Sequence, residues 1–229
     1  MNHSEHNHHH HAHQHHHHAK SEIKTDVTYE NGKILIKLED NNGKPPELAI
    51  QHEKEMHFII ISNDLEKYYH LHPVKEQQGI YSVEQVLSDG TYQAFVDITP
   101  ENKAYQIKPN TLQVGTRATS KVTLGKKDSW TKESGGKTVT LNAGNAVVGK
   151  EVPLVFDTQG EKSDPYLGAL GHVVIIDENV EQYIHVHPET EVTTKFNAYF
   201  PTPGMYKIWA EFKFGENVQV YPFIIKVKE

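Results

Sequence analysis

The 229-residue chain contains no cysteine, which excludes disulfides, thiolate metal sites and cysteine nucleophiles together. It has no excess of positive charge either, because 23 Lys and Arg residues stand against 30 Asp and Glu residues, for a formal net charge of -7. This balance leaves no general basic surface for phosphate groups and argues against nucleic-acid binding. No apolar run approaches the roughly 18 residues that a membrane-spanning helix needs, and the N-terminal segment lacks the apolar stretch of a secretory signal. Imidazole and carboxylate groups remain as possible metal ligands.

Histidine, in contrast, is abundant, with 18 in the chain. Eleven of these lie within residues 3–18, where no hydrophobic period exists, so we predict a disordered His-rich tail over residues 1–21. Imidazoles at this density bind Zn, Cu, Ni or Co ions and lose affinity as the pH falls through about 6. Asn, Ala, Gln, Ser and Glu interrupt the run, which favours a natural metal-collecting tail over the alternative of a purification tag.

The other seven histidines reveal an internal repeat. Residues 57–73 align without a gap to residues 172–188, with 8 of 17 positions identical and a constant offset of 115. The identities include a closing proline and three histidines in each copy, whereas His52 has no counterpart. The repeated histidines are His57, His70, His72, His172, His185 and His187. The repeat predicts two homologous modules.

Both modules have the pattern of β-structure. Short segments rich in Val, Ile, Tyr and Phe alternate with Gly, Asn, Asp and Pro turns, and no run has a persuasive helical period. We predict an all-β protein with two tandem immunoglobulin-like β-sandwich modules, related by the internal repeat and preceded by the disordered His-rich tail. The expected bounds are residues 22–114 for module 1, 115–136 for a linker and 137–229 for module 2.

Four tyrosines also recur between the modules. Tyr92 lines up with Tyr206 after a one-residue change in spacing, and Tyr68 lines up with Tyr183. We expect these four to belong to the sandwich core or to a tyrosine corner. Trp209 lies among alternating apolar positions and is expected in the core as well.

Strand geometry predicts how the first set of histidines could converge. Alternate residues of a strand share a face, so His70 and His72 project together. The turn signal Ser62–Leu65 predicts a hairpin, and a loop of two or four residues pairs positions whose numbers sum to 127. That register places His57 opposite His70 with His72 as the diagonal neighbour. A loop of three or five residues without a bulge would instead send His57 to the other face.

The same spacing predicts the same arrangement in the second copy, with His172 opposite His185. Three converging imidazoles suit Zn(II) or Cu(II), with a fourth position for water, a carboxylate or a thioether. Met56 is one possible soft ligand in the first copy. The alternative is that the histidines are hydrogen-bonded structural residues, but their recurrence as a set favours metal binding.

These motifs resemble those of bacterial extracytoplasmic β-sandwich proteins related to the YtkA-like and copper-associated immunoglobulin-like domains. The resemblance spans both modules and is carried by Met56–His57, His70–Pro73, Pro165–His172, His185–Pro188 and Phe200–Phe212. It implies an exported, often lipid-anchored protein that handles metal and does not catalyse a reaction. We therefore expect an extracytoplasmic location, in the cell envelope or secreted, if a leader peptide precedes the printed sequence, and a cytoplasmic location otherwise.

The leading hypothesis is a non-enzymatic protein that binds copper or zinc on a three-His site in each module, while the tail collects ions. Its expected partners are metal ions and an envelope protein that transfers them, with no nucleic acid and no membrane span. One alternative is a cell-envelope interaction module with structural histidines. Another is a metalloenzyme whose open ligand position activates water or dioxygen, although no Ser, Cys or Lys nucleophile motif supports it.

Overall fold

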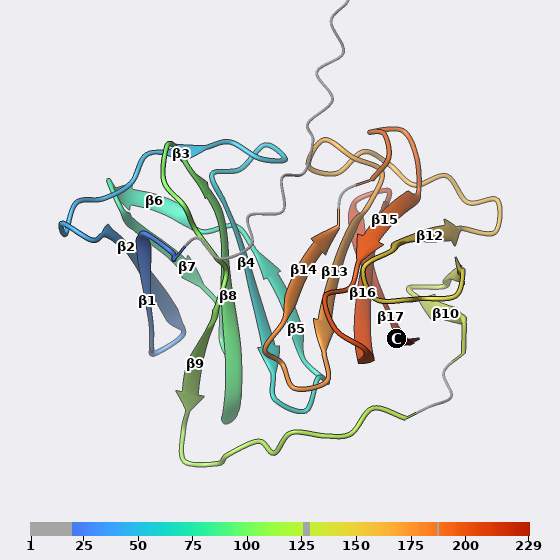
Figure 1. Cartoon of the computed structure of the whole chain (residues 1–229), viewed down its shortest axis with the longest axis horizontal. Coiled ribbons are helices and arrows are strands. Elements are labelled where there is room, and N and C mark those ends of the chain that lie inside the picture. The colour runs from blue at the N-terminus through green and yellow to red at the C-terminus, as the bar shows by residue number, and fades with distance from the viewer. Residues whose placement is uncertain (1–19, 126–128, 187) are drawn as a thin grey trace, which may run out of the picture.

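The computed structural model describes residues 20–125, 129–186 and 188–229. Apart from its last two positions, the predicted tail lies outside the described residues, and so does the predicted ligand His187. In the described parts of the chain every regular element is a strand, so none of them is a helix long and apolar enough to cross a membrane. Figure 1 shows the strands gathered into two modules that lie side by side.

Module 1 contains nine of the strands. They are β1 (Ile23–Glu30), β2 (Lys33–Asp40), β3 (Leu48–Ala49), β4 (Met56–Ser62), β5 (Tyr68–Leu71), β6 (Val74–Gln77), β7 (Ile80–Glu84), β8 (Gly90–Pro100) and β9 (Pro109–Val114). One antiparallel sheet has the order β1-β2-β7-β6 and the other has the order β3-β8-β4-β5, with β9 also paired to β8. In β2 the side chains of Ile34, Ile36 and Leu38 are buried while Lys33, Leu35 and Lys37 between them are exposed, the two-residue period of a strand with one face in a core.

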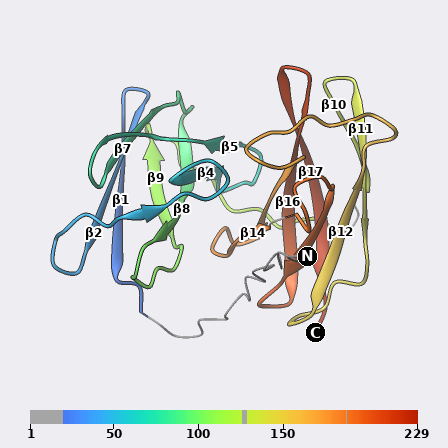
Figure 2. The same cartoon turned by 90° about the horizontal axis from the view of Figure 1, so that it is seen from above.

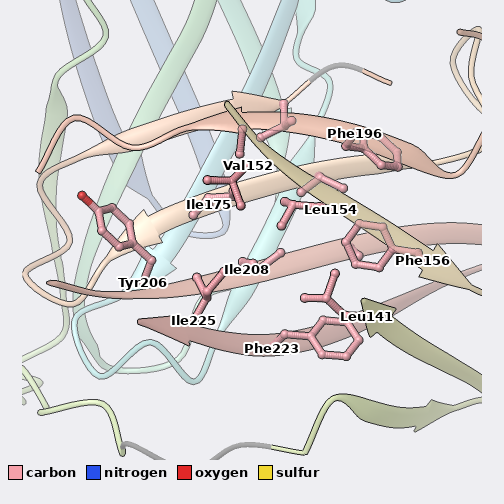
Figure 3. Packing of buried hydrophobic residues seen from close by; sticks show 14 of the residues in the cluster. Leu141, Val152, Leu154, Phe156, Ile175, Phe196, Tyr206, Ile208, Phe223 and Ile225 are labelled. Carbon is pink, nitrogen blue, oxygen red and sulfur yellow. The ribbon is translucent and has the colours of Figure 1, made fainter. Parts of the chain in front are cut away.

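Module 2 contains eight strands. They are β10 (Thr131–Ser134), β11 (Lys137–Ala143), β12 (Glu151–Asp157), β13 (His172–Asp177), β14 (Tyr183–Val186), β15 (Lys195–Tyr199), β16 (Gly204–Phe214) and β17 (Asn217–Val227). Their sheets have the orders β10-β11-β12-β15 and β14-β13-β16-β17. Between the sheets, Leu154 and Phe156 of β12 pack in one buried cluster with Ile208 of β16 and Phe223 of β17 (Figure 3).

The prediction of an all-β protein with two tandem immunoglobulin-like sandwich modules is therefore confirmed. The repeat is structural as well, because β4, β5 and β8 pair in the same order as β13, β14 and β16. Each module has a tyrosine corner, in which the Tyr92 hydroxyl donates to the Ser88 carbonyl and the Tyr206 hydroxyl donates to the Thr202 carbonyl, both at 2.9 Å. This confirms the prediction for these two tyrosines.

The connection between the modules is partly structured. Strand β10 falls within the segment predicted as linker, residues 115–136, and pairs with β11 of module 2. The sheet of module 2 therefore begins before residue 137. Leu124, from the same segment, is buried against the interface between the modules.

The modules pack through β4 and β13, whose residues are all buried. In β4, Phe58 and Ile60 face the core of module 1, whereas Ile59 and Ile61 belong to a separate cluster. That cluster also contains Val174, Ile176 and Trp209 of module 2 and is the apolar part of the interface. Figure 1 shows β4, β5, β13 and β14 near the middle of the molecule, where this interface lies, and Figure 2 shows β5 and β14 facing each other there from above.

Two aromatic pairs flank the interface. The ring of Tyr68 stacks on Trp209 with centroids 5.1 Å apart, and the ring of Phe95 stacks on Tyr183 with centroids 5.3 Å apart. The two pairs correspond under the repeat, since Phe95 and Trp209 each lie three residues after a corner tyrosine. Tyr68 and Tyr183 thus pack between the modules, and their predicted place in a sandwich core or tyrosine corner was wrong.

Candidate metal centre

The five predicted ligands that the structure describes come together at the module interface. The rings of His57, His70 and His72 have centroids 4.8 to 5.3 Å apart. The ring centroid of His185 of module 2 lies 5.5 Å from that of His57, and the ring centroid of His172 lies 6.1 Å from that of His70. The two sets of histidines therefore face each other and form one cluster built from both modules.

The register of the hairpins differs from the prediction. Ile59 pairs with His70, and Val174 pairs with His185. The residue numbers of paired positions therefore sum to 129 and 359, whereas the prediction required 127 and 357. The amide of Ser62 donates a hydrogen bond to the Lys67 carbonyl and closes the hairpin loop. Four residues therefore lie between Ser62 and Lys67. The shift of two residues makes His70 diagonal to His57 but keeps both on one face, because the side-chain period is also two.

In module 1 three imidazoles converge on one point. The Nδ1 atom of His57 lies 3.0 Å from Nε2 of His70, and one nitrogen from each of His57, His70 and His72 lies within 4.8 Å of the others. Imidazoles on one tetrahedral Zn(II) ion have nitrogens roughly 3.3 Å apart and ring centroids about 5 Å apart, given Zn–N bonds of about 2.0–2.1 Å. This set, which we call the first triad, therefore has the dimensions of a three-His metal site.

Hydrogen bonds on the outer side of the first triad fix which nitrogens point inward. His57 donates from Nε2 to the backbone carbonyl of Gln51 at 3.1 Å, and His70 donates from Nδ1 to Glu211 at 2.7 Å. With the protons on the outer nitrogens, Nδ1 of His57 and Nε2 of His70 face each other at 3.0 Å, a distance that a shared proton or a metal ion between them would satisfy. Outer hydrogen bonds of this kind orient the histidines of known metal sites.

Module 2 repeats these outer contacts. His172 donates from Nε2 to the carbonyl of Tyr166 at 2.8 Å, and His185 donates from Nδ1 to Asp97 at 2.6 Å. The Tyr183 hydroxyl also donates to Asp97, at 2.9 Å. Both described histidines of the second copy therefore turn their other ring nitrogen toward the cluster.

Asp97 and Glu211 occupy matching places in the two modules. Asp97 of β8 is opposite His57 in the sheet register, and Glu211 of β16 is opposite His172. Yet each carboxylate binds a histidine of the other module. Neither carboxylate was predicted as part of the site, although each is the one acidic residue in its buried segment, Thr91–Ile98 or Met205–Phe212.

His52 is a third group that the sequence analysis missed. Its ring lies 5.6 Å from His172, 5.9 Å from His185 and 6.1 Å from His57, measured between centroids. It occupies a tight turn closed by paired backbone hydrogen bonds between Gln51 and Lys54. No sequence signal identified it, because its repeat partner is Leu167.

Met56 is not available as a ligand. Its side chain is 2% exposed and packs in the core of module 1, because neighbouring strand residues point to opposite faces and His57 faces the interface. The matching Gly171 has no room for a side chain, since a Cβ atom there would lie 2.5 Å from the ring of Phe212. The suggestion of a thioether ligand at Met56 was therefore wrong.

Burial keeps His57, His72 and His172 neutral. It lowers the pKa of His57 to about 4 and the pKa values of His72 and His172 to about 3, helped by the charges of neighbouring histidines. For Asp97, burial alone would raise the pKa, but the charge of His185 and hydrogen bonds from His185 and Tyr183 lower it. At neutral pH His57, His72 and His172 are therefore unprotonated, the state in which imidazole binds metal.

Comparison with known proteins places the chain in a family. The model for a domain of unknown function, DUF8832, matches residues 16–116 and 132–229, which together cover both modules. The chain belongs to the DUF8832 family. A comparison with curated proteins gave no match for this DUF8832 protein.

Three solved structures that resemble the DUF8832 protein do so at low identity. Two fibronectin type III domains of chicken tenascin are 10% identical, with 89% of this chain and 97% of that chain covered and a TM-score of 0.28. The chicken interferon gamma receptor alpha chain is 12% identical, with coverages of 92% and 99% and a TM-score of 0.29. The Yersinia pseudotuberculosis adhesin InvE is 11% identical, with coverages of 91% and 59% and a TM-score of 0.24. Similarity at this level carries no argument about function.

Proposed function

We propose that this DUF8832 protein is a non-enzymatic protein that binds a transition-metal ion, copper or zinc, on the first triad. The observation that carries the proposal is the convergence of three ring nitrogens from His57, His70 and His72 within 4.8 Å. The outer nitrogens of His57 and His70 are occupied by Gln51 and Glu211, so the inward nitrogens are the ones left for an ion.

The energetics of burial favour a metal site over a purely structural role. Buried polar atoms are normally hydrogen-bonded, and leaving one unsatisfied costs roughly 1–3 kcal/mol. The Nε2 atom of His72 is buried without a hydrogen bond among the described residues. An ion on the first triad would satisfy this atom and also separate the facing lone pairs of His57 and His70.

The ligand set narrows the choice of ion. Three imidazoles without a thiolate suit Zn(II) and Cu(II), and the affinity order favours Cu(II). A fourth position would be taken by water or by a ligand from a partner. We further propose that the repeat-related set His172, His185 and His187 binds metal, and that the tail collects ions for the modules.

The wider biological setting follows from the same proposal. A protein that binds ions on paired modules and carries a His-rich tail would serve metal handling outside the cytoplasm, as the resemblance to YtkA-like proteins implies. Its partners would be the ions themselves and an envelope protein that delivers or receives them.

The test must separate the modules from the tail. We would use the full-length chain with the eleven tail histidines replaced by asparagine, called here the tail-substituted chain. Metal content by mass spectrometry and calorimetric titration with Cu(II) and Zn(II) should show tight binding, and His72→Ala should remove one equivalent. Met56→Leu is the matched control, because Met56 adjoins His57 but faces the module core. Absence of tight binding in the tail-substituted chain would overturn the proposal and favour a cell-envelope interaction module with structural histidines.

A further inference from the structure

His52 breaks the repeat, although the turn that carries it does not. The turn Gln51–Lys54 matches the turn Tyr166–Ala169, and each is closed by two backbone hydrogen bonds. Leu167 stands at the position of His52 in the second turn, and the two residues have similar φ angles of 50° and 46°. The fold of the turn therefore does not account for the imidazole of His52.

The first triad is closed off from solvent in the folded protein. His57 is 2% exposed, the side chain of His70 is also 2% exposed, and Nε2 of His72 is buried. An ion that binds these nitrogens must therefore pass through the protein between the surface and the triad.

A small cavity connects the surface with the first triad. It has a volume of about 70 Å³, and its lining includes Lys54 and Thr99, which are exposed, and His57, which is buried. The cavity thus reaches from exposed residues to one member of the triad. A single water needs roughly 10–15 Å³ of such space, so the cavity has room for an ion that still carries water ligands.

The lining of this cavity suits a cation in transit. The carboxylates of Glu55 and Asp97 outnumber the one lysine, Lys54, and the half-buried imidazole of His52 lies beside them. The ring centroid of His52 lies 6.1 Å from that of His57, about 1 Å beyond the spacing of rings that share one tetrahedral ion. His52 is therefore close enough to pass an ion to His57 but lies outside the set of nitrogens that converge.

We propose that this cavity is the route by which a transition-metal ion reaches and leaves the first triad, with His52 as a transient ligand on the way. The inference rests on the proposed function, since it describes how the same site is loaded and emptied. The ion binds the ring of His52 first, and this bond breaks as the bonds to the triad form. A transient ligand lowers the barrier in both directions, so it speeds uptake and release by the same factor and leaves the equilibrium affinity unchanged.

The test replaces His52 in the tail-substituted chain. His52→Asp and His52→Asn are a matched pair, because both new residues tolerate positive φ but only the carboxylate is a good metal ligand. His52→Leu is a further variant, since Leu167 occupies the matching turn position. Each chain is loaded with Zn(II) and mixed with an excess of a chromophoric chelator, which measures the rate of release, and competition at equilibrium measures the affinity. The phase of release that His72→Ala removes belongs to the first triad.

We expect His52→Asn and His52→Leu to slow release from the first triad at least about 10-fold, the low end of what a site that concentrates its ligand contributes to association rates. Their affinity for Zn(II) should be unchanged, and His52→Asp should release the ion nearly as fast as the tail-substituted chain. Equal release rates in all four chains would overturn the inference and leave the proposed function standing. A weaker affinity in His52→Asn and His52→Leu would also overturn it, because His52 would then be a ligand of the bound ion. If the tail-substituted chain binds no ion, the inference and the proposed function both fail.

Discussion

Glu211 of module 2 accepts a hydrogen bond from Nδ1 of His70 in module 1 at 2.7 Å, and the two side chains are 6% and 2% exposed. A carboxylate in this position fixes the ring of a ligating histidine and makes its other nitrogen more basic. The group that orients the ligand thus belongs to a different module from the ligand. We therefore expect the affinity of the first triad for an ion to depend on the docking of the modules.

Glu211→Gln tests this dependence. The amide keeps the shape of the side chain but removes its charge, so we expect the first ion to bind about 10- to 100-fold more weakly. Competition with a chromophoric chelator in the tail-substituted chain measures the change. Glu216→Gln is the control, because that residue is exposed on the turn after β16 of the same module, and it should leave the affinity unchanged. Equal affinities for the two variants would contradict a role for Glu211.

The metal-free protein should lose stability in acid. The folded-state pKa values of His57 and His72, about 4 and about 3, lie below the ordinary value of 6.5. Between pH 6.5 and these lower values, the unfolded chain therefore binds more protons than the folded chain. Stability is then fully present above about pH 6.5 and falls with decreasing pH, by roughly 1.4 kcal/mol per pH unit for each proton taken up. Urea unfolding with EDTA from pH 7.5 to 4.5 measures the slope. A flat profile would show that the histidines are not held neutral.

Trp209→Ala should weaken the interface. Trp209 is 3% exposed and stacks on Tyr68 of the other module, so truncation should cost about 3–5 kcal/mol in the free energy of unfolding. Urea titration followed by circular dichroism measures the loss. Trp130→Ala offers a matched control at 43% exposure and should change stability little. A similar small effect at Trp209 would mean that the stack contributes nothing to the fold.

Tyr206→Phe should test the tyrosine corner of module 2. Removing the hydroxyl deletes its hydrogen bond to the Thr202 carbonyl, and we expect a loss of about 0.5–1.5 kcal/mol. Tyr92→Phe should give a loss of the same size in module 1, because its hydroxyl donates to Ser88 at the same distance. Thermal unfolding compares the two, with the exposed Tyr199→Phe as reference. Losses of stability no larger than that of Tyr199→Phe would show that the tyrosine corners do not stabilise the modules.

Much of the fold could be predicted from the sequence because it depends on local period. Alternating apolar residues, turn residues and the repeat gave the strands and the two modules. His57 and His70 lie on one face as predicted, although the predicted register was wrong by two residues, because a shift of two returns each side chain to the same face. A shift of one would have separated them.

The meeting of the two His sets could not be predicted in the same way, because a strand's period does not say what covers its outer face. The available signal was the unbroken apolar runs Phe58–Ile61 and Val173–Ile176, which are typical of strands buried on both faces. Asp97 and Glu211 were not predicted as part of the site for a related reason. Their partners are distant in sequence, and only the docked modules bring each carboxylate to its histidine.

The crossed hydrogen bonds of Asp97 and Glu211 have the form of an isologous dimer interface, in which residue i of one subunit contacts residue j of the other and j contacts i. Two identical subunits would be bound to keep both halves of such an interface alike, because every substitution in a homodimer appears twice. A single chain that carries both halves is free of that constraint. His52 in one half and Leu167 in the other make use of this freedom, so the two halves of the interface share a geometry but differ in the side chains that they place at it.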